Sequence, residues 1–116
     1  MGRLTTHVLD TARGRPAAGV GIALFRADAG TDVIVTAVTN QDGRCDKPLL
    51  EGAAFTAGRY QLVFQAGAYF AGSGLAAGDL PFLDEVVIRF GIAAPDQHYH
   101  VPLLLSPYGY TTYRGS

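Results

Sequence analysis

The sequence predicts an all-β domain in which two sheets pack as a sandwich. Apolar and polar residues alternate with a period of two in several short segments, as they do in half-buried strands. Turn residues separate these segments at intervals of about 8–12 residues, and 15 glycines and 6 prolines interrupt most helical patterns. Six or seven short strands without alternating helices are typical of a β-sandwich or barrel, and we favour a sandwich.

Three strands are predicted in the first half of the chain. They are Leu4–Asp10, Val20–Arg26 and the β-branched run Val33–Thr39. The loop Thr11–Gly19 and the turn Asp28–Asp32 connect them. The segment Asn40–Gly43 reads Asn-Gln-Asp-Gly, a strong turn pattern because glycine tolerates positive φ and Asn and Asp bond to nearby backbone.

The second half contains three more predicted strands and the single candidate helix. A short helix is predicted within Lys47–Ala57, where Leu and Ala residues cluster loosely. The strands are Arg59–Gln65, Glu85–Ile92 and the extended part of Gln97–Ser116. The Gly/Ala-rich stretch Phe70–Phe82 is predicted to be a loop, and Ala93–Gln97 a turn.

Composition and charge bound the class of protein. At 116 residues the chain is long enough for one domain, residues 1–116, with a real core. The net charge is −1, and the basic residues are scattered from Arg3 to Arg114, which argues against a nucleic-acid partner. No apolar run approaches the about 18 residues of a membrane span, so no membrane partner is expected.

The location that these features predict is the cytoplasm. The start of the chain, MGRLTTHV, has no hydrophobic segment of the secretory kind. The single cysteine, Cys45, excludes an internal disulfide and fits a reducing compartment.

All three histidines fall on strand faces that also carry apolar residues. In the last strand, one face carries His98, His100, Pro102 and Leu104, and the opposite, core-type face carries Tyr99, Val101, Leu103 and Leu105. In the first strand, His7 shares its face with Thr5 and Leu9. Solvated faces would not be expected to carry these apolar residues. We infer that both faces line one partly dry surface, which we expect at a subunit interface.

Several interpretations of these polar residues remain open. Each histidine could be an ordinary half-buried side chain. His7, His98 and His100 could also supply three nitrogen ligands to zinc, but no carboxylate or cysteine stands nearby in sequence, and no metal is predicted. Arg44 could hold a carbonyl group bidentately or be a solvated turn residue.

The end of the chain offers aromatic groups but no nucleophile. Tyr108, Tyr110 and Tyr113 give the tail an aromatic content that disordered ends usually lack, so the tail is expected to pack against the domain. Neither Cys45 nor Ser106 has a partner base that the sequence can identify. Any catalysis at this site is therefore expected to use bound water.

Three separated motifs resemble the transthyretin-like 5-hydroxyisourate hydrolases. They are LTTHVLDTARGRPAAGV at Leu4–Val20, TNQDGR at Thr39–Arg44 and YHVPLLLSPYGYTTYRGS at Tyr99–Ser116. The resemblance implies a transthyretin-like two-sheet sandwich of seven to eight strands with one short helix. It also implies a homotetramer, a dimer of dimers with active sites at the dimer–dimer interface.

The same resemblance implies a reaction and its residues. The reaction is hydrolysis of 5-hydroxyisourate, the product of urate oxidation, to 2-oxo-4-hydroxy-4-carboxy-5-ureidoimidazoline, without a cofactor. The implied catalytic residues are His7, Arg44 and His100; substrate contacts are implied for His7, Arg44, Tyr113 and Ser116, and His98 is a possible supporting residue. The alternative is a carrier of the transthyretin type, which holds a small ligand in the same channel without chemistry.

Overall fold

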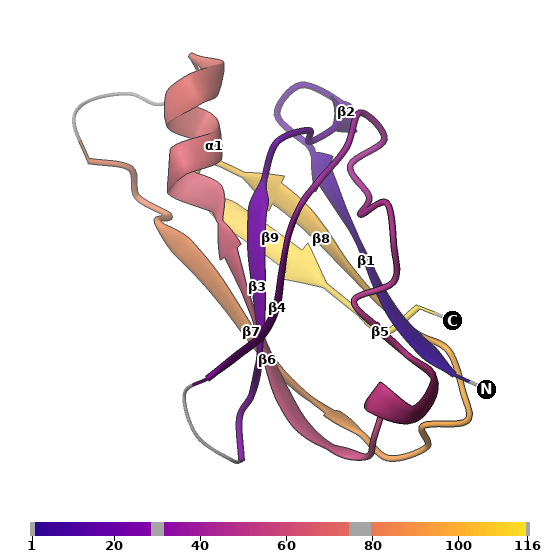
Figure 1. Ribbon diagram of the computed structural model, residues 1–116. Coiled ribbons are helices and arrows are strands. Elements are labelled where there is room, and N and C mark those ends of the chain that lie inside the picture. The colour runs from indigo at the N-terminus through magenta and orange to yellow at the C-terminus, as the bar shows by residue number, and fades with distance from the viewer. Residues whose placement is uncertain (1, 29–31, 75–79, 116) are drawn as a thin grey trace.

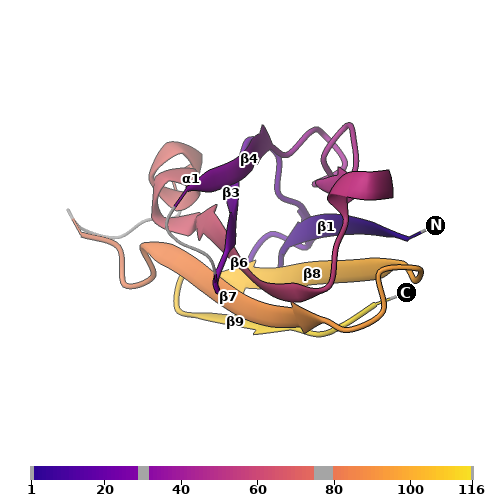
Figure 2. The ribbon, with the colours of Figure 1, turned by 60° about the horizontal axis from the view of Figure 1, so that its bottom comes forward.

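The fold is a two-sheet sandwich with one short α-helix, as a computed structural model of the chain shows for residues 2–28, 32–74 and 80–115. The strands are β1 (Arg3–Asp10), β2 (Arg15–Pro16), β3 (Gly21–Arg26), β4 (Val33–Val38), β5 (Leu50–Glu51), β6 (Gly58–Gln65), β7 (Glu85–Ile92), β8 (Tyr99–Ser106) and β9 (Gly109–Thr112). Helix α1 spans Ala66–Ser73. Figures 1 and 2 show the two sheets face to face, with α1 at one end and both termini together at the other. The predicted all-β sandwich is confirmed.

One sheet joins the two ends of the chain. Its order is β2-β1-β8-β9, with β5 also paired to β1. Strands β1 and β8 run parallel, with Thr5 opposite His100 and His7 opposite Pro102. The second sheet has the order β4-β3-β6-β7 and is antiparallel throughout. Because β1 pairs directly with β8, residues near opposite ends of the sequence share one face.

The alternation read from the sequence produces the core between these sheets. In β1, residues at even positions are buried and those at odd positions from Thr5 to Leu9 are half-buried. Leu4, Val8, Leu62, Leu103 and Leu105 are each 0 % exposed. The outer face of β1 and β8 carries Thr5, His7 and His100, which are polar but only partly exposed, beside the apolar Leu9, Pro102 and Leu104.

The helix is the element that the sequence-based prediction misplaced. It spans Ala66–Ser73, partly inside the stretch Phe70–Phe82 that was predicted to be a loop. The predicted helical region Lys47–Ala57 instead contains strand β5 and a single 3₁₀ turn at Gly52–Ala54.

Tertiary packing explains why α1 forms in a weakly helical sequence. Its N-cap residue makes no side-chain capping bond, and glycine disfavours helix interiors. Two contacts compensate: Phe70 is 1 % exposed, and the Gly67 N–H donates to the Asp84 carbonyl over 2.7 Å. A Cβ on Gly67 would lie 2.9 Å from Pro81, so glycine permits this close approach. Gly74 ends the helix in the left-handed region, at φ 79°.

A buried carboxylate ties α1 to the first strand. Asp10 is 0 % exposed, and it accepts hydrogen bonds from the Tyr69 hydroxyl at 2.6 Å and from the Arg13 N–H at 3.0 Å. Burial and, after it, the bond to Asp10 raise the pKa of Tyr69 to about 12. The phenol therefore stays protonated and donates at neutral pH.

Replacing Tyr69 with phenylalanine is expected to lower the free energy of unfolding by about 1–3 kcal/mol, because Asp10 would lose a hydrogen-bond donor while staying buried. Urea unfolding at fixed protein concentration measures the change. Tyr108→Phe is the matched control, since Tyr108 is 70 % exposed. Equal stabilities of the two variants would show that the Tyr69–Asp10 bond contributes little.

Within the described parts of the chain, no helix is long and apolar enough to cross a membrane.

Candidate active site

The pairing of β1 with β8 brings His7 and His100 together. Their strands are neighbours, and their side chains leave the sheet on the same face. The ring centroids are 6.3 Å apart and the ring planes are tilted by 41°. Both imidazoles are half-buried. The shared face inferred from the two separate alternation patterns therefore exists within one chain.

A tight turn carries Arg44 to the same place. The Asn40 side-chain oxygen accepts the backbone N–H groups of Asp42, at 2.9 Å, and of Arg44, at 3.2 Å. Gly43 lies in the left-handed region at φ 75°, which a side chain would strain. The sequence pattern that predicted a turn thus specifies its backbone.

The turn also docks directly on β1. The Val8 N–H donates to the Gly43 carbonyl over 2.8 Å, and a Cβ on Gly43 would lie 2.3 Å from the Val8 carbonyl oxygen. Only glycine fits this contact. The result is an isolated antiparallel bridge between His7 and Arg44, so the guanidinium belongs to a segment fixed against the histidine strand.

The same turn also holds the His7 ring. His7 Nε2 lies 2.9 Å from the Asp42 carbonyl oxygen. A carbonyl can only accept, so Nε2–H donates, and Nδ1 is the nitrogen that carries the lone pair in the neutral ring.

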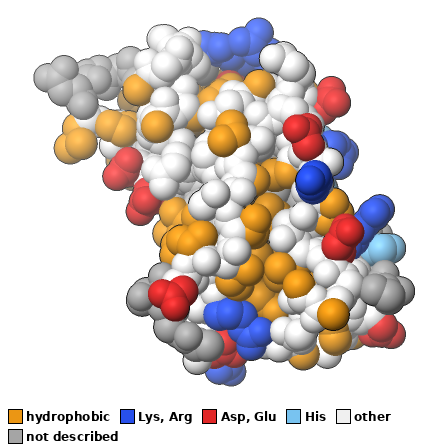
Figure 3. Space-filling view, viewed as in Figure 1, with side chains coloured by type: hydrophobic (Ala, Val, Ile, Leu, Met, Phe, Trp, Pro, Cys, Tyr) orange, Lys and Arg blue, Asp and Glu red, His pale blue; other side chains and the backbone are white. Residues whose placement is uncertain are grey.

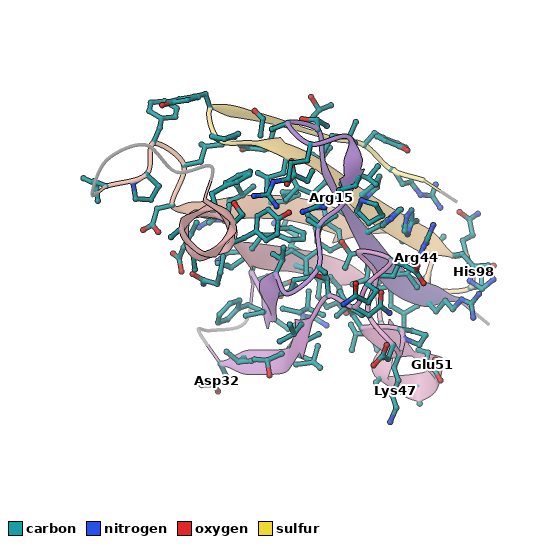
Figure 4. All side chains as sticks on the ribbon, turned by 90° about the horizontal axis from the view of Figure 1, so that it is seen from above. Arg15, Asp32, Arg44, Lys47, Glu51 and His98 are labelled. Atoms are coloured by element: carbon teal, nitrogen blue, oxygen red, sulfur yellow. The ribbon has the colours of Figure 1, made fainter. Side chains whose placement is uncertain are left out.

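His100 and Arg44 open onto one cleft of about 360 Å³. Its described lining consists of Arg3, Thr5, Thr6, Arg44, Cys45, Lys47 and His100. Three cations and no carboxylate line it, which favours an anion or a group that becomes negative during a reaction. Figure 4 shows Arg44 over the strands of the first sheet, with Lys47 projecting farther out beside Glu51.

Both imidazoles are biased towards the neutral form. Burial lowers the pKa of His100 from its ordinary 6.5, and the charges of Arg44 and His7 lower it further. Burial and then Arg44 lower the pKa of His7, against a smaller upward effect of the bond to Asp42. A neutral imidazole can remove a proton at neutral pH.

The His7 and His100 rings are expected to titrate below pH 6.5, the ordinary value, and Arg44→Gln should raise both pKa values by removing a nearby positive charge. Chemical-shift titration of ¹⁵N-labelled histidine measures these values. Because the folded state binds fewer protons than the unfolded chain in this window, stability should fall as pH drops below 6.5. Arg89→Gln, which changes an exposed arginine bonded to Gln61, is the control. Unchanged histidine pKa values in Arg44→Gln would contradict the electrostatic coupling.

His98 lies away from this cleft. It is exposed and precedes β8, and Figure 4 shows it at the rim of the molecule. In the parts of the chain that are described, no three His, Cys, Asp or Glu side chains form a group that could hold a metal ion. The hypothetical zinc site of His7, His98 and His100 is therefore not assembled in this structure.

The aromatic tail packs back on the domain, as expected. Gly109–Thr112 forms β9 against β8, and the Arg114 guanidinium lies 4.0 Å from the ring centroid of Tyr99. Tyr113, however, is 59 % exposed and lines a separate groove with Ile88 and Phe90. Within one chain it does not contact the histidine cleft. Ser116 lies outside the described residues.

Thr5 is the residue at this site to which sequence reasoning gave no role. Its Oγ1 lies 2.8 Å from His100 Nδ1. Alternation placed Thr5 on the His7 face, but only the parallel register reveals that it stands opposite His100.

A larger cleft of about 510 Å³ lies between the first loop and α1. Its polar side chains are those of Arg13, Arg15, Gln41, Tyr69 and Ser73. The hydroxyl of Tyr69, with its pKa of about 12, is a donor to Asp10 rather than a base. The smaller cleft is thus the better candidate for proton-transfer chemistry.

Figure 3 shows an apolar surface on the face of the molecule drawn there. Apolar side chains gather along its middle, where β3 and β4 run, and charges of both signs surround them. Val33, Ile34 and Val38 of β4 are exposed. In this view the histidine colour appears at the right edge, away from these apolar side chains.

Comparison with known proteins gives a consistent result. The pattern described as "HIUase/Transthyretin family" matches residues 4–115. The 5-hydroxyisourate hydrolase of Pseudomonas aeruginosa is 57 % identical over 117 residues, covering 100 % of this chain and 93 % of that protein. The 5-hydroxyisourate hydrolase 2 of Rhizobium meliloti is 60 % identical over 116 residues, covering 99 % and 97 %.

Solved structures share the fold. An (S)-allantoin synthase is 48 % identical with a TM-score of 0.94; the match covers 99 % of this chain but 44 % of that longer one. Sea bream transthyretin, solved in complex with thyroxine, is 33 % identical with a TM-score of 0.85, covering 97 % and 94 %. The similarity thus extends to hydrolases and to a thyroxine-binding protein.

Proposed function

The chain belongs to the HIUase/transthyretin family, and we propose that it hydrolyses 5-hydroxyisourate with His7, Arg44 and His100 as catalytic residues. Relatives more than half identical over almost the whole chain are named as this enzyme. The observation that carries the residue assignment is the close approach of two neutral-biased imidazoles, of which His100 lines one cleft together with the Arg44 guanidinium. The reaction belongs to the degradation of urate.

The hydrolysis requires a base and an oxyanion stabiliser. One imidazole removes a proton from water while the water oxygen bonds to the ring carbonyl carbon of the substrate. Arg44 donates to the oxygen that becomes negative, a role that is typically worth about 3–4 kcal/mol. The C–N bond of the cyclic amide then breaks, and the imidazolium returns its proton to the leaving nitrogen.

The cationic lining fits this reaction. Arg3, Arg44 and Lys47 surround the cleft without a carboxylate in its described lining. Positive charge there attracts an electron-rich, urate-like ring and stabilises the tetrahedral oxyanion. No metal or cofactor is required by the steps proposed.

Two further substrate contacts are part of the proposal. Tyr113 and Ser116 are proposed to contact the substrate in the assembled protein, although Tyr113 lines another groove of its own chain. His98 is proposed to have at most a supporting role, because it is exposed beyond the start of β8.

We propose a homotetramer with sites at the dimer–dimer interface. Leu9 and Leu104 are half-buried and Pro102 is buried on the face that carries the histidines, which suits a surface covered by a second dimer. Sedimentation equilibrium would then give the mass of four chains.

A cytoplasmic location is also proposed, because Cys45 is a free thiol.

The decisive experiment is an assay on freshly generated 5-hydroxyisourate. Substrate decay, followed by ultraviolet absorbance, is expected to accelerate in proportion to protein concentration above the spontaneous rate. The combined variant His7→Ala, Arg44→Ala, His100→Ala is the matched blank. Decay at the spontaneous rate with the wild-type protein would refute the proposed activity.

The carrier alternative is tested separately with thyroxine, which the sea bream relative binds in its solved structure. Tight equilibrium binding of thyroxine without turnover of 5-hydroxyisourate would favour the carrier. Activity abolished by a chelator and restored by zinc would instead favour metal-dependent chemistry.

A further inference from the structure

A hydrogen bond between two side chains joins the strands that carry the histidines. Thr5 of β1 and His100 of β8 are direct partners in the parallel ladder. Thr5 Oγ1 lies 2.8 Å from His100 Nδ1, and both residues are half-buried. Partial burial limits competition from water, so this bond restrains the ring more firmly than an exposed one would.

The C-terminal tail closes another side of the His100 ring. The Gly115 N–H donates to the His100 carbonyl over 2.7 Å, and the His100 N–H donates back over 3.3 Å. A Cβ on Gly115 would lie 3.2 Å from His100 Cδ2. The imidazole therefore packs against tail backbone, and Nε2 is its remaining polar atom.

The position of the ring proton determines which nitrogen can act as a base. A threonine hydroxyl can either donate to Nδ1 or accept a hydrogen bond from it. If Thr5 donated, Nε2 would carry the proton of the neutral ring and could not accept another. If Thr5 accepts, Nε2 carries the lone pair.

Two features of the site favour acceptance by Thr5. The Arg44 guanidinium lines the same cleft as His100, and a lone pair on Nε2, the ring's remaining polar atom, suits a positively charged cleft better than an N–H does. In addition, the imidazolium that forms when Nε2 takes the proton from water has an N–H at both nitrogens. Its Nδ1–H then needs an acceptor, which the Thr5 oxygen already provides.

We propose that Thr5 is a positioning residue: its hydroxyl oxygen accepts the Nδ1–H of His100, which leaves Nε2 as the nitrogen that takes the proton from water. This inference deepens the proposed hydrolase function and relies on it for the chemistry. It identifies His100 as the base through Nε2, whereas His7, whose Nε2–H is bonded to the Asp42 carbonyl, would have only Nδ1 for that role.

The charged and titratable groups around His100 come from two segments. They are Arg3 and His7 on β1, and Arg44, Cys45 and Lys47 after the Asn40 turn. All the permanently charged members are cations. Protonation of the neutral ring is therefore disfavoured. The Thr5 oxygen offsets this disadvantage, because it accepts a hydrogen bond from the Nδ1–H of the imidazolium.

The first test uses no substrate. In ¹⁵N-histidine-labelled protein at about pH 8, where a histidine of ordinary or lowered pKa is neutral, two-bond ¹H–¹⁵N spectra distinguish the tautomers. His100 is expected to be protonated at Nδ1 and His7 at Nε2. Each ring therefore serves as a reference for the tautomer that the other lacks. His100 protonated at Nε2 would overturn the proposal.

The second test compares Thr5→Val with Thr5→Ser, which keeps the hydroxyl. Thr5→Val is expected to lower kcat by roughly 10- to 100-fold, with little change in KM and with the acidic limb of the kcat profile moved to lower pH. Thr5→Ser should restore most of the rate and the position of that limb. An unchanged profile in Thr5→Val would overturn the positioning role.

Thr112→Val is the matched control for strand stability. Thr112 Oγ1 likewise bonds to β8, but it donates to the Pro102 carbonyl over 2.8 Å and does not touch His100. It is expected to leave the His100 tautomer unchanged. If Thr5→Val fails to fold, the wild-type and Thr5→Ser spectra decide the question; if the wild-type protein does not turn over 5-hydroxyisourate, the proposed function fails while the tautomer result stands.

Discussion

Replacing His100 with alanine is expected to lower kcat/KM for 5-hydroxyisourate by about 10²- to 10⁴-fold, the usual contribution of a general base. The ring lines the cleft beside Arg44, and burial and nearby cations keep it neutral at pH 7. Initial rates of absorbance change, corrected for spontaneous decay, measure the loss.

His98→Ala is the comparison that makes this result specific. His98 is exposed and stands two residues from His100, so a general effect of losing an imidazole near the start of β8 would appear in both variants. We expect His98→Ala to keep a rate close to the wild type. A larger loss in His7→Ala than in His100→Ala would instead identify His7 as the base.

Arg44→Gln is expected to lower kcat by about 10²- to 10³-fold, because one preorganised donor to the oxyanion would be lost. The substitution should change KM less than kcat, since the oxyanion exists only beyond the ground state. Steady-state kinetics at saturating and limiting substrate separate the two constants.

The turn itself should keep its fold when the Arg44 side chain is replaced. Its hydrogen bonds, from the Arg44 N–H to Asn40 Oδ1 and from the Val8 N–H to the Gly43 carbonyl, do not involve the guanidinium. Arg44→Lys keeps the charge but lacks the planar pair of donors, so an intermediate rate is expected. A rise in KM at constant kcat would show that Arg44 binds substrate and transition state equally.

Local sequence patterns specified much of the scaffold. Alternation in Leu4–Asp10, Arg59–Gln65 and Glu85–Ile92 predicted strands that the structure contains as β1, β6 and β7. These patterns succeed because successive side chains in a strand must face opposite sides. The Asn40–Gly43 turn was equally readable, because its conformation depends on Asn40 and Gly43 themselves.

Helix α1 shows where local information was insufficient. Its glycines disfavour a helix interior, and its N-cap residue makes no side-chain bond. The burial of Phe70 and the hydrogen bond from the Gly67 N–H to the Asp84 carbonyl stabilise it instead. Both contacts join segments distant in sequence, so the sequence-based prediction missed the helix.

The sequence by itself determined the sheet-forming pattern, the histidine-bearing faces and the family motifs, because each depends on neighbouring residues or on a short ordered string. Tertiary structure alone decided that Thr5 meets His100, that the Asp42 carbonyl holds His7, and that His98 stays outside the cleft. These relations depend on the parallel register of β1 with β8 and on the docking of a turn against Val8. Registers between strands about 95 residues apart are set by packing of the whole core, and local propensity carries no information about them.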